Sequence, residues 1–308
     1  MTERLTSQHM ELVKGLYQTP ASISPKYFYD AKGSALFEHI TRLQAYYPTR
    51  TEQAIMVSHT PEIARAVGAN RTVIELGAGN CQKAKYLYEL IGPARFVADD
   101  ISEAFLHEAV DGMRLAFPHL AIDAIASDLT ADIRLPASLP PSRRLVFYPG
   151  SSIGNFDPPH AQALLSRMRG LLQDDGALLV GVDLVKDKAV LHAAYDDNDG
   201  ITAAFNLNVL SHVNWLIGSD FDTSQWQHRA FFNAEQSRIE MHLEAKTDLL
   251  MRWRNGARSF AKGERIHTEN SYKYQVEDFV ALLLRAGFSQ TRVWTDEQDW
   301  YAVVLARP

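Results

Sequence analysis

The sequence predicts an α/β fold with a doubly wound, mostly parallel sheet whose last strand is antiparallel, and a smaller α+β lobe. Three observations favour this fold. Short apolar segments alternate with helical ones between residues 71 and 185, which is typical of a parallel sheet covered on both faces. The alternation stops after Lys186, where helical and then period-two patterns follow. Residues 275–308 return to a helix and a hairpin.

The alternating region contains five predicted strands, at residues 71–76, 95–101, 120–129, 143–152 and 176–185. Its helices are predicted at residues 81–91, 102–117 and 159–172. Further elements are a helical stretch, a strand region, a helix and a closing hairpin, at residues 188–210, 236–254, 275–288 and 290–308. Because the hairpin returns the chain to the sheet, we expect an antiparallel last strand.

These patterns predict how the chain is divided. Residues 1–60 are expected to form a helical N-terminal segment that contributes to the smaller lobe. The α/β domain is expected to comprise residues 61–189 and 263–308, and the inserted part of the lobe residues 190–262.

Composition limits the partners of the chain. Its 308 residues are 46% hydrophobic and 22% charged, as in an ordinary soluble globular protein. A net charge of −6 argues against nucleic acid and anionic membranes, and no apolar run is long enough to span a bilayer. The single cysteine, Cys81, excludes an intramolecular disulfide and suits a reducing cytosol. The 11 histidines form no metal-ligand pattern, so we expect no metal. We also expect the protein to be a cytoplasmic monomer.

The stretch "VIELGAGNCQ" joins the first predicted strand to its helix through two glycines, Gly77 and Gly79. A dinucleotide fingerprint needs a third glycine where Gln82 stands, and a P-loop needs a Gly-Lys-Ser/Thr sequence that is absent. The loop therefore makes no obvious provision for phosphates, which suits a nucleoside without a pyrophosphate.

Acidic residues follow at the ends of the next two strands. Asp100 is placed to accept hydrogen bonds from ribose hydroxyl groups, with Asp99 as the neighbouring candidate. Asp128, at the end of the third strand, is placed to meet an adenine amino group. Together these positions indicate a nucleoside site, and S-adenosylmethionine is the common cofactor of that kind.

Four longer motifs make the chain resemble a particular family. The segments "KYFYDAKGSALFEHITRLQAYYPTRTE", "VIELGAGNCQKAKYL", "FYPGSSIGNFDP" and "TENSYKY" are similar to the histidine-specific Nα-methyltransferases of ergothioneine biosynthesis. The resemblance spans about Ser24 to Ala306. It implies a Rossmann-like methyltransferase domain with a substrate-binding lobe. It also implies three methyl transfers from S-adenosylmethionine to the α-amino group of L-histidine, which yield hercynine and S-adenosylhomocysteine.

The resemblance also assigns residues to the cofactor. It implies contacts from Gly77, Lys83, Asp100, Asp128 and Gly150. Asp100 would hold the ribose and Asp128 the adenine. Lys83, in the first turn of its helix, is expected to reach the methionine carboxylate. Gly150 would lie where a side chain would intrude on the cofactor or substrate.

On the substrate side, the resemblance implies that Asn155 holds the carboxylate and amino end of the amino acid and that Tyr195 also contacts the carboxylate. Glu269 and Ser271 would grip the imidazole. The remaining implied residues line the pocket around the α-amino group: Tyr29, Phe37 and Tyr46. We assign Tyr46 the catalytic role of orienting the amine, because a phenol of pKa about 10 is a weak base. Tyr47 remains the alternative by one position.

Two departures from the family pattern leave alternatives open. Asn270 stands where an aliphatic residue is expected, and Asn80-Cys81 replaces a Ser/Thr-rich run. Another amino acid or a thiolated histidine is therefore an alternative substrate. A catalytically inactive protein that binds S-adenosylmethionine or an amino acid is the alternative from another class. Retention of the whole residue set, Tyr46 and Glu269 included, favours the enzyme.

Overall fold

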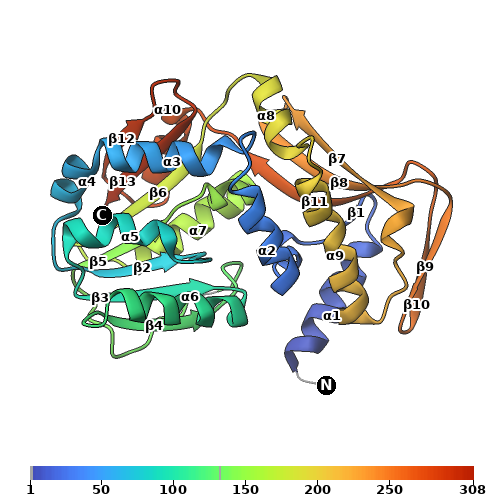
Figure 1. Cartoon of the computed structure of the whole chain (residues 1–308), viewed down its shortest axis with the longest axis horizontal. Coiled ribbons are helices and arrows are strands. Elements are labelled where there is room, and N and C mark those ends of the chain that lie inside the picture. The colour runs from blue at the N-terminus through green and yellow to red at the C-terminus, as the bar shows by residue number, and fades with distance from the viewer. Residues whose placement is uncertain (1–2, 132) are drawn as a thin grey trace. The chain divides into compact units, whose positions relative to one another are not determined.

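A computed structural model describes residues 3–131 and 133–308 and divides the chain into two compact units (Figure 1). Unit 1 comprises Met1–Tyr46 and Asp187–Ser271, and unit 2 comprises Tyr47–Lys186 and Tyr272–Pro308. The first boundary precedes the expected residue 60 because helix α3 (Tyr47–Ser58) packs against strand β13 (Tyr301–Arg307) of unit 2.

Unit 2 contains a seven-stranded sheet in the order β12-β13-β6-β5-β2-β3-β4. The strands are β2 (Thr72–Leu76), β3 (Arg95–Asp100), β4 (Ala121–Ala126), β5 (Arg144–Tyr148), β6 (Ala177–Asp183), β12 (Gln290–Thr295) and β13. Strands β6, β5, β2, β3 and β4 are parallel, whereas β13 is antiparallel to both β12 and β6. The expected sheet with an antiparallel last strand is confirmed.

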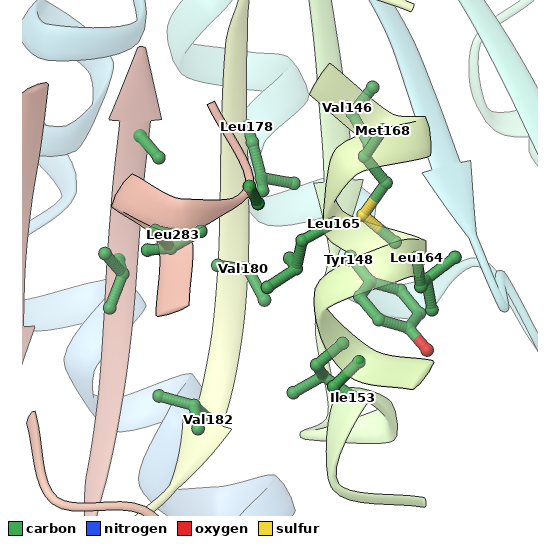
Figure 2. Close-up of a cluster of buried hydrophobic side chains, with 14 of the residues drawn as sticks. Val146, Tyr148, Ile153, Leu164, Leu165, Met168, Leu178, Val180, Val182 and Leu283 are labelled. Carbon is green, nitrogen blue, oxygen red and sulfur yellow. The ribbon is translucent and has the colours of Figure 1, made fainter. Parts of the chain in front are cut away.

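Helices cover both faces of this sheet, because its central strands are apolar at even and odd positions alike. On one face, Val146, Tyr148 and Val180 pack with Leu164 and Leu283 (Figure 2). These last two residues belong to α7 (Pro158–Gly170) and α10 (Val276–Arg285). The opposite face is covered by helices α3, α4 (Thr60–Val67), α5 (Gln82–Ile91) and α6 (Glu103–Ala116). The result is the doubly wound arrangement that the sequence predicts.

Unit 1 combines helices with a four-stranded sheet in the order β1-β11-β8-β7 and a separate β9–β10 pair. Its helices are α1 (Glu3–Leu16), α2 (Ala31–Ile40), α8 (Lys188–Tyr195) and α9 (Ile201–Ile217). Its strands are β1 (Ala21–Ser22), β7 (Trp226–Asn233), β8 (Arg238–Ala245), β9 (Leu249–Trp253), β10 (Gly256–Phe260) and β11 (Arg265–Tyr272). Of these, β1, β7, β10 and β11 lie outside the strands predicted from the sequence.

Helix α2 is fixed by the motif "YDAKG". The carboxylate of Asp30 caps the helix by accepting a hydrogen bond from the amide of Gly33 at 2.7 Å. The same carboxylate accepts a hydrogen bond from the amide side chain of Asn208 in α9 at 2.8 Å. A side chain at Gly33 would meet the carbonyl oxygen of Phe28 at 1.7 Å, so only glycine fits. The motif therefore joins α2 to α9.

Candidate active site

The residues expected to contact the cofactor lie along one edge of the unit 2 sheet, where its parallel strands end. Gly77 follows β2 directly, and Asp100 is the last residue of β3. Asp128 and Gly150 come two residues after β4 and β5. The chain order reverses between β2 and β5, and ligands of open α/β sheets bind at such a switch point.

The glycine loop after β2 fits a ligand that approaches the backbone closely. Gly77 and Gly79 have φ angles of +67° and +52°, which favour glycine. A Cβ atom at either position would meet no atom within 4 Å, so the loop leaves room above its backbone. Behind it, burial raises the pKa of Glu75 well above its usual value. One Glu75 oxygen has no hydrogen-bond partner among the described residues.

The two aspartates at the end of β3 have different surroundings. Both oxygens of Asp99 lie 2.7 Å from the hydroxyl of Ser127, and its side chain is fully buried. Asp100 is less buried and accepts hydrogen bonds from the amides of Gly79 and Ser102, each at 2.9 Å. Burial raises the pKa of Asp100, although these amides oppose the shift. Asp100 is thus the aspartate bound to the glycine loop.

Asp128 organises the turn that follows β4. Its carboxylate accepts hydrogen bonds from the backbone amide and the hydroxyl of Thr130, at 2.9 and 2.6 Å. The preceding residue, Ser127, donates its amide to the carbonyl of Asp100. The turns that carry Asp100 and Asp128 are therefore joined directly.

Lys83, in the first turn of α5, is held by a residue that the sequence reasoning missed. The ammonium group of Lys83 lies 2.7 Å from Glu52 Oε2, and Glu52 Oε1 accepts a hydrogen bond from the amide of Gly150 at 2.8 Å. Glu52 is only 4% exposed, because it shares the buried face of α3 with Ile55 and Met56. A carboxylate at helical spacing from two apolar residues was the signal available in the sequence.

Asn155 lies at the end of a short 3₁₀ helix, Ser152–Asn155, which follows β5 in unit 2. The preceding residue, Gly154, approaches Tyr272 closely, since a Cβ atom there would lie 2.9 Å from the Tyr272 carbonyl oxygen. Glycine at this position therefore sets the path of the segment that carries Asn155.

The structure separates Tyr46 from Tyr47. The hydroxyl of Tyr47 lies 2.8 and 2.7 Å from the two carboxylate oxygens of Asp183, and the residue is 0% exposed. Tyr46 is partly exposed, and its ring lies 6.4 Å from that of Phe37 and 6.1 Å from that of Tyr195. Tyr46 therefore lies among the residues expected to line the amine pocket, and Tyr47 lies in the interior of unit 2.

The aromatic residues of unit 1 form a connected group. The rings of Tyr29 and Phe37 meet edge to face at 5.9 Å. Both also contact Phe205 of α9, at 6.0 and 5.9 Å. The sequence reasoning missed Phe205, because α9 is apolar around most of its circumference and no periodicity marks one face.

Tyr195 connects this group to the strand that carries the expected imidazole contacts. Its hydroxyl lies 2.7 Å from the hydroxyl of Ser271 in β11. Glu269, two residues earlier in the strand, is likewise buried. The structure thus brings together Tyr29, Phe37, Tyr46, Tyr195 and Ser271, with Glu269 beside them on the strand.

Strand β11 does not alternate regularly. The side chain of His267 lies 2.8 Å from that of Asn270, so residues three apart share a face. Regular alternation would place them on opposite faces, and one extra residue, as in a β-bulge, accounts for the shift. Burial does not alternate along the strand either, because Thr268 and Glu269 are both buried, as are Ser271 and Tyr272. Asn270, the departure from the family pattern, therefore faces away from Ser271.

Within residues 3–131 and 133–308, no cluster of three or more His, Cys, Asp or Glu side chains is arranged to hold a metal ion. Among the helices of the same residues, none is both long and apolar enough to cross a membrane.

The glycine loop, the strand-end aspartates and the antiparallel β13 define a Rossmann-like methyltransferase. A solved structure of a candidate O-methyltransferase from Nostoc punctiforme is similar in fold, with a TM-score of 0.50 at 13% identity, covering 100% of this chain and 69% of that one. The family model of S-adenosylmethionine-dependent, histidine-specific methyltransferases matches residues 8–308.

The chain belongs to this family of histidine-specific methyltransferases, and S-adenosylmethionine is its cofactor. It is 41% identical over 299 residues to the histidine N-alpha-methyltransferase of Mycolicibacterium smegmatis, covering 95% of this chain and 92% of that protein. It is 38% identical over 305 residues to the protein of that name from Mycobacterium tuberculosis, covering 96% and 93%. The expected family and cofactor are confirmed.

Proposed function

We propose that the chain transfers three methyl groups from S-adenosylmethionine to the α-amino group of L-histidine and releases hercynine. The observation that carries the choice of histidine is the buried pair Glu269 and Ser271 in β11, with Ser271 hydrogen-bonded to Tyr195. An imidazole has two polar nitrogens, and a carboxylate beside a hydroxyl offers each a partner.

Unit 2 is proposed to hold the cofactor, which supplies a methyl group on a sulfonium ion for in-line displacement by the amine. Gly77 admits the cofactor to the loop backbone, and Gly150 leaves space beside Lys83. Asp100 accepts from the ribose hydroxyls, and Asp128 accepts from the adenine amino group. Lys83 pairs with the carboxylate of the methionine moiety.

Orientation of the amine is the proposed role of Tyr46. Attack requires a neutral nitrogen about 3–3.5 Å from the methyl carbon and in line with it. Desolvation of the ammonium group lowers its pKa and favours the neutral form. The hydroxyl of Tyr46, a partly exposed residue, then orients the lone pair, while Asn155 and Tyr195 hold the carboxylate end.

The aromatic group of unit 1 suits the product. Each transfer makes the nitrogen more substituted, and the last leaves a permanent cation. Aromatic faces within about 6 Å attract such a cation without a hydrogen bond. Tyr29, Phe37 and Tyr46 supply three rings, of which that of Phe37 contacts the other two. They are proposed to line the space around the methylated nitrogen.

Incubation with S-adenosylmethionine and each of the twenty amino acids, followed by mass spectrometry, tests the proposal. The expected result is a gain of three methyl groups on histidine alone. Methylation of another amino acid instead would overturn the specificity assigned to Glu269 and Ser271. Methylation of thiolated histidine alone would transfer the reaction to that substrate, and binding without any turnover would support the inactive alternative.

The proposal includes a cytoplasmic monomer. A buried, unpaired Cys81 supports a reducing compartment. Size-exclusion chromatography with light scattering checks the monomer directly against the chain mass of 34.6 kDa. A mass of twice that value would contradict it.

A further inference from the structure

The carboxylate of Glu52 joins three distant parts of unit 2. Oε2 pairs with the ammonium group of Lys83 in α5 at 2.7 Å. Oε1 accepts hydrogen bonds from the amide of Gly150 at 2.8 Å and from the hydroxyl of Tyr301 in β13 at 2.7 Å. Oε2 therefore binds the lysine, and Oε1 binds the backbone at Gly150 and the sheet residue Tyr301.

The space around this carboxylate is shaped for it by glycines. A Cβ atom at Gly181 in β6 would lie 2.0 Å from Glu52 Oε1 and 2.3 Å from the Tyr301 hydroxyl. A Cβ atom at Gly150 would lie 2.8 Å from the Lys83 ammonium nitrogen. Any residue larger than glycine at position 181 or 150 would therefore collide with Glu52 or with Lys83, respectively.

Burial differs sharply between the two partners. The Glu52 side chain is 6% exposed, whereas that of Lys83 is 32% exposed. A buried carboxylate keeps its cationic partner, because an unpaired buried charge is strongly destabilising. An ammonium group has three donors, so Lys83 retains donors for a second anion after pairing with Glu52. The carboxylate therefore fixes the lysine while leaving it available.

We propose that Glu52 is a positioning residue for the cofactor. It holds the Lys83 ammonium group beside Gly150, where Lys83 pairs with the carboxylate of the methionine moiety. This inference rests on the proposed role of Lys83. It assigns Glu52 an effect on the amino-acid part of the cofactor alone, because its described partners include no atom of the glycine loop or of the turn at Asp128.

Three adenosine ligands separate this role from a merely structural one. S-adenosylmethionine and S-adenosylhomocysteine both carry the amino-acid part, whereas 5′-methylthioadenosine lacks it. Calorimetry would measure the dissociation constant of each for the parent enzyme and for Glu52→Gln. The variant is expected to bind the first two roughly tenfold to a hundredfold more weakly. Its affinity for methylthioadenosine is expected to stay unchanged.

Tyr301→Phe is the matched control, because it removes a hydrogen bond to Oε1 and leaves the oxygen that holds Lys83. It is expected to keep the ratio of the two dissociation constants, for S-adenosylmethionine and methylthioadenosine, at the parent value. Equal weakening of all three ligands by Glu52→Gln, or no weakening, would overturn the inference.

Lys83→Met distinguishes a failure of this inference from a failure of the proposed function. If Lys83→Met weakens the two amino-acid-bearing ligands but Glu52→Gln does not, only the role of Glu52 is lost. If Lys83→Met also leaves the dissociation constants of these two ligands unchanged, the proposed role of Lys83 itself is wrong. With both roles correct, the double variant binds no more weakly than Lys83→Met, since the residues act as one unit.

Discussion

Tyr46 and Tyr47 are consecutive in the chain, but their side chains belong to different units and different surroundings. The Tyr47 hydroxyl is hydrogen-bonded to Asp183 in the interior of unit 2, whereas the Tyr46 ring faces Phe37 and Tyr195 in unit 1. One tyrosine is thus buried and hydrogen-bonded, and the other is partly exposed beside aromatic rings.

Replacement of each tyrosine by phenylalanine separates these roles. Tyr46→Phe is expected to lower kcat/KM for histidine roughly a hundredfold, because the amine loses its orienting group. Its melting temperature is expected to stay near that of the parent. Tyr47→Phe is expected to cost about 1–3 kcal/mol of stability, since a buried carboxylate loses a donor. Kinetics and thermal unfolding of both variants check this, and exchanged phenotypes would refute it.

Glu269→Gln retains the size of the side chain and removes its charge. The dissociation constant for histidine is expected to rise roughly tenfold to a hundredfold, because a charge-assisted hydrogen bond to the imidazole is lost. The dissociation constant for S-adenosylmethionine should not change. Calorimetric titration with each ligand measures both dissociation constants. An equal loss of affinity for histidine and for S-adenosylmethionine would refute the proposed contact between Glu269 and the imidazole.

The two aspartates at the end of β3 should respond differently. Asp100→Ala is expected to weaken S-adenosylmethionine binding at least about tenfold, since it removes both the ribose acceptor and the bond to Gly79. Asp99→Asn should bind the cofactor nearly as the parent does, because Asp99 faces Ser127. Unchanged affinity of Asp100→Ala for the cofactor would exclude the proposed contact between Asp100 and the ribose.

The charges around Asp183 predict a dependence of stability on pH. Asp183 pairs with Lys186 and with Lys273, at 2.5 and 2.7 Å, so one buried carboxylate faces two ammonium groups. Burial lowers the pKa of Lys186 from 10.5 to about 8, although Asp183 and Asp296 oppose the shift and Lys273 adds to it. Burial would raise the pKa of Asp183, but the two lysines hold it below its usual value.

Between pH 8 and 10.5, the unfolded chain therefore keeps a proton on Lys186 that the folded chain has lost. Stability rises with pH where the unfolded state binds more protons, here by about 1 kcal/mol per pH unit. Urea unfolding of the parent and of Lys186→Met across this range measures the contribution. The parent should gain stability relative to the variant, and a constant difference between them would refute the prediction.

Asn270→Ile tests the consequence of the irregularity in β11. Because Asn270 bonds to His267 and faces away from Ser271, the variant is expected to keep its preference for histidine. A stability loss of about 1 kcal/mol is expected from the lost hydrogen bond. Competition between histidine and the other amino acids measures the preference. A change of preferred substrate would show that Asn270 reaches the imidazole.

The strand ends that carry the expected cofactor residues are the part that the sequence predicts well. Asp100 and Asp128 are found by locating apolar strands and reading the residues that follow them, because parallel strands end at a common edge. The same reasoning could not choose between Asp99 and Asp100. That choice depends on which carboxylate Ser127 binds, a contact 28 residues away in the chain.

The remaining features depend on packing that has no local signature. Glu52 resembles a solvated helix charge until its helix is placed against β13. Tyr46 and Tyr47 differ only in which side of a unit boundary they occupy. Asn270 appeared to weaken the choice of histidine because it stands between Glu269 and Ser271 in the sequence, where no strand was predicted. The structure places it in β11, and its side chain contacts His267.

The insertion of β13 between β12 and β6 has a consequence for protein synthesis. β6 is buried along its whole length and pairs on one side with β13, whose residues are translated more than a hundred positions later. At typical elongation rates the nascent chain carries this unpaired edge for on the order of ten seconds. Exposed strand edges template aggregation. This protein is therefore expected to aggregate more readily during synthesis, when many ribosomes translate it at once, than after folding.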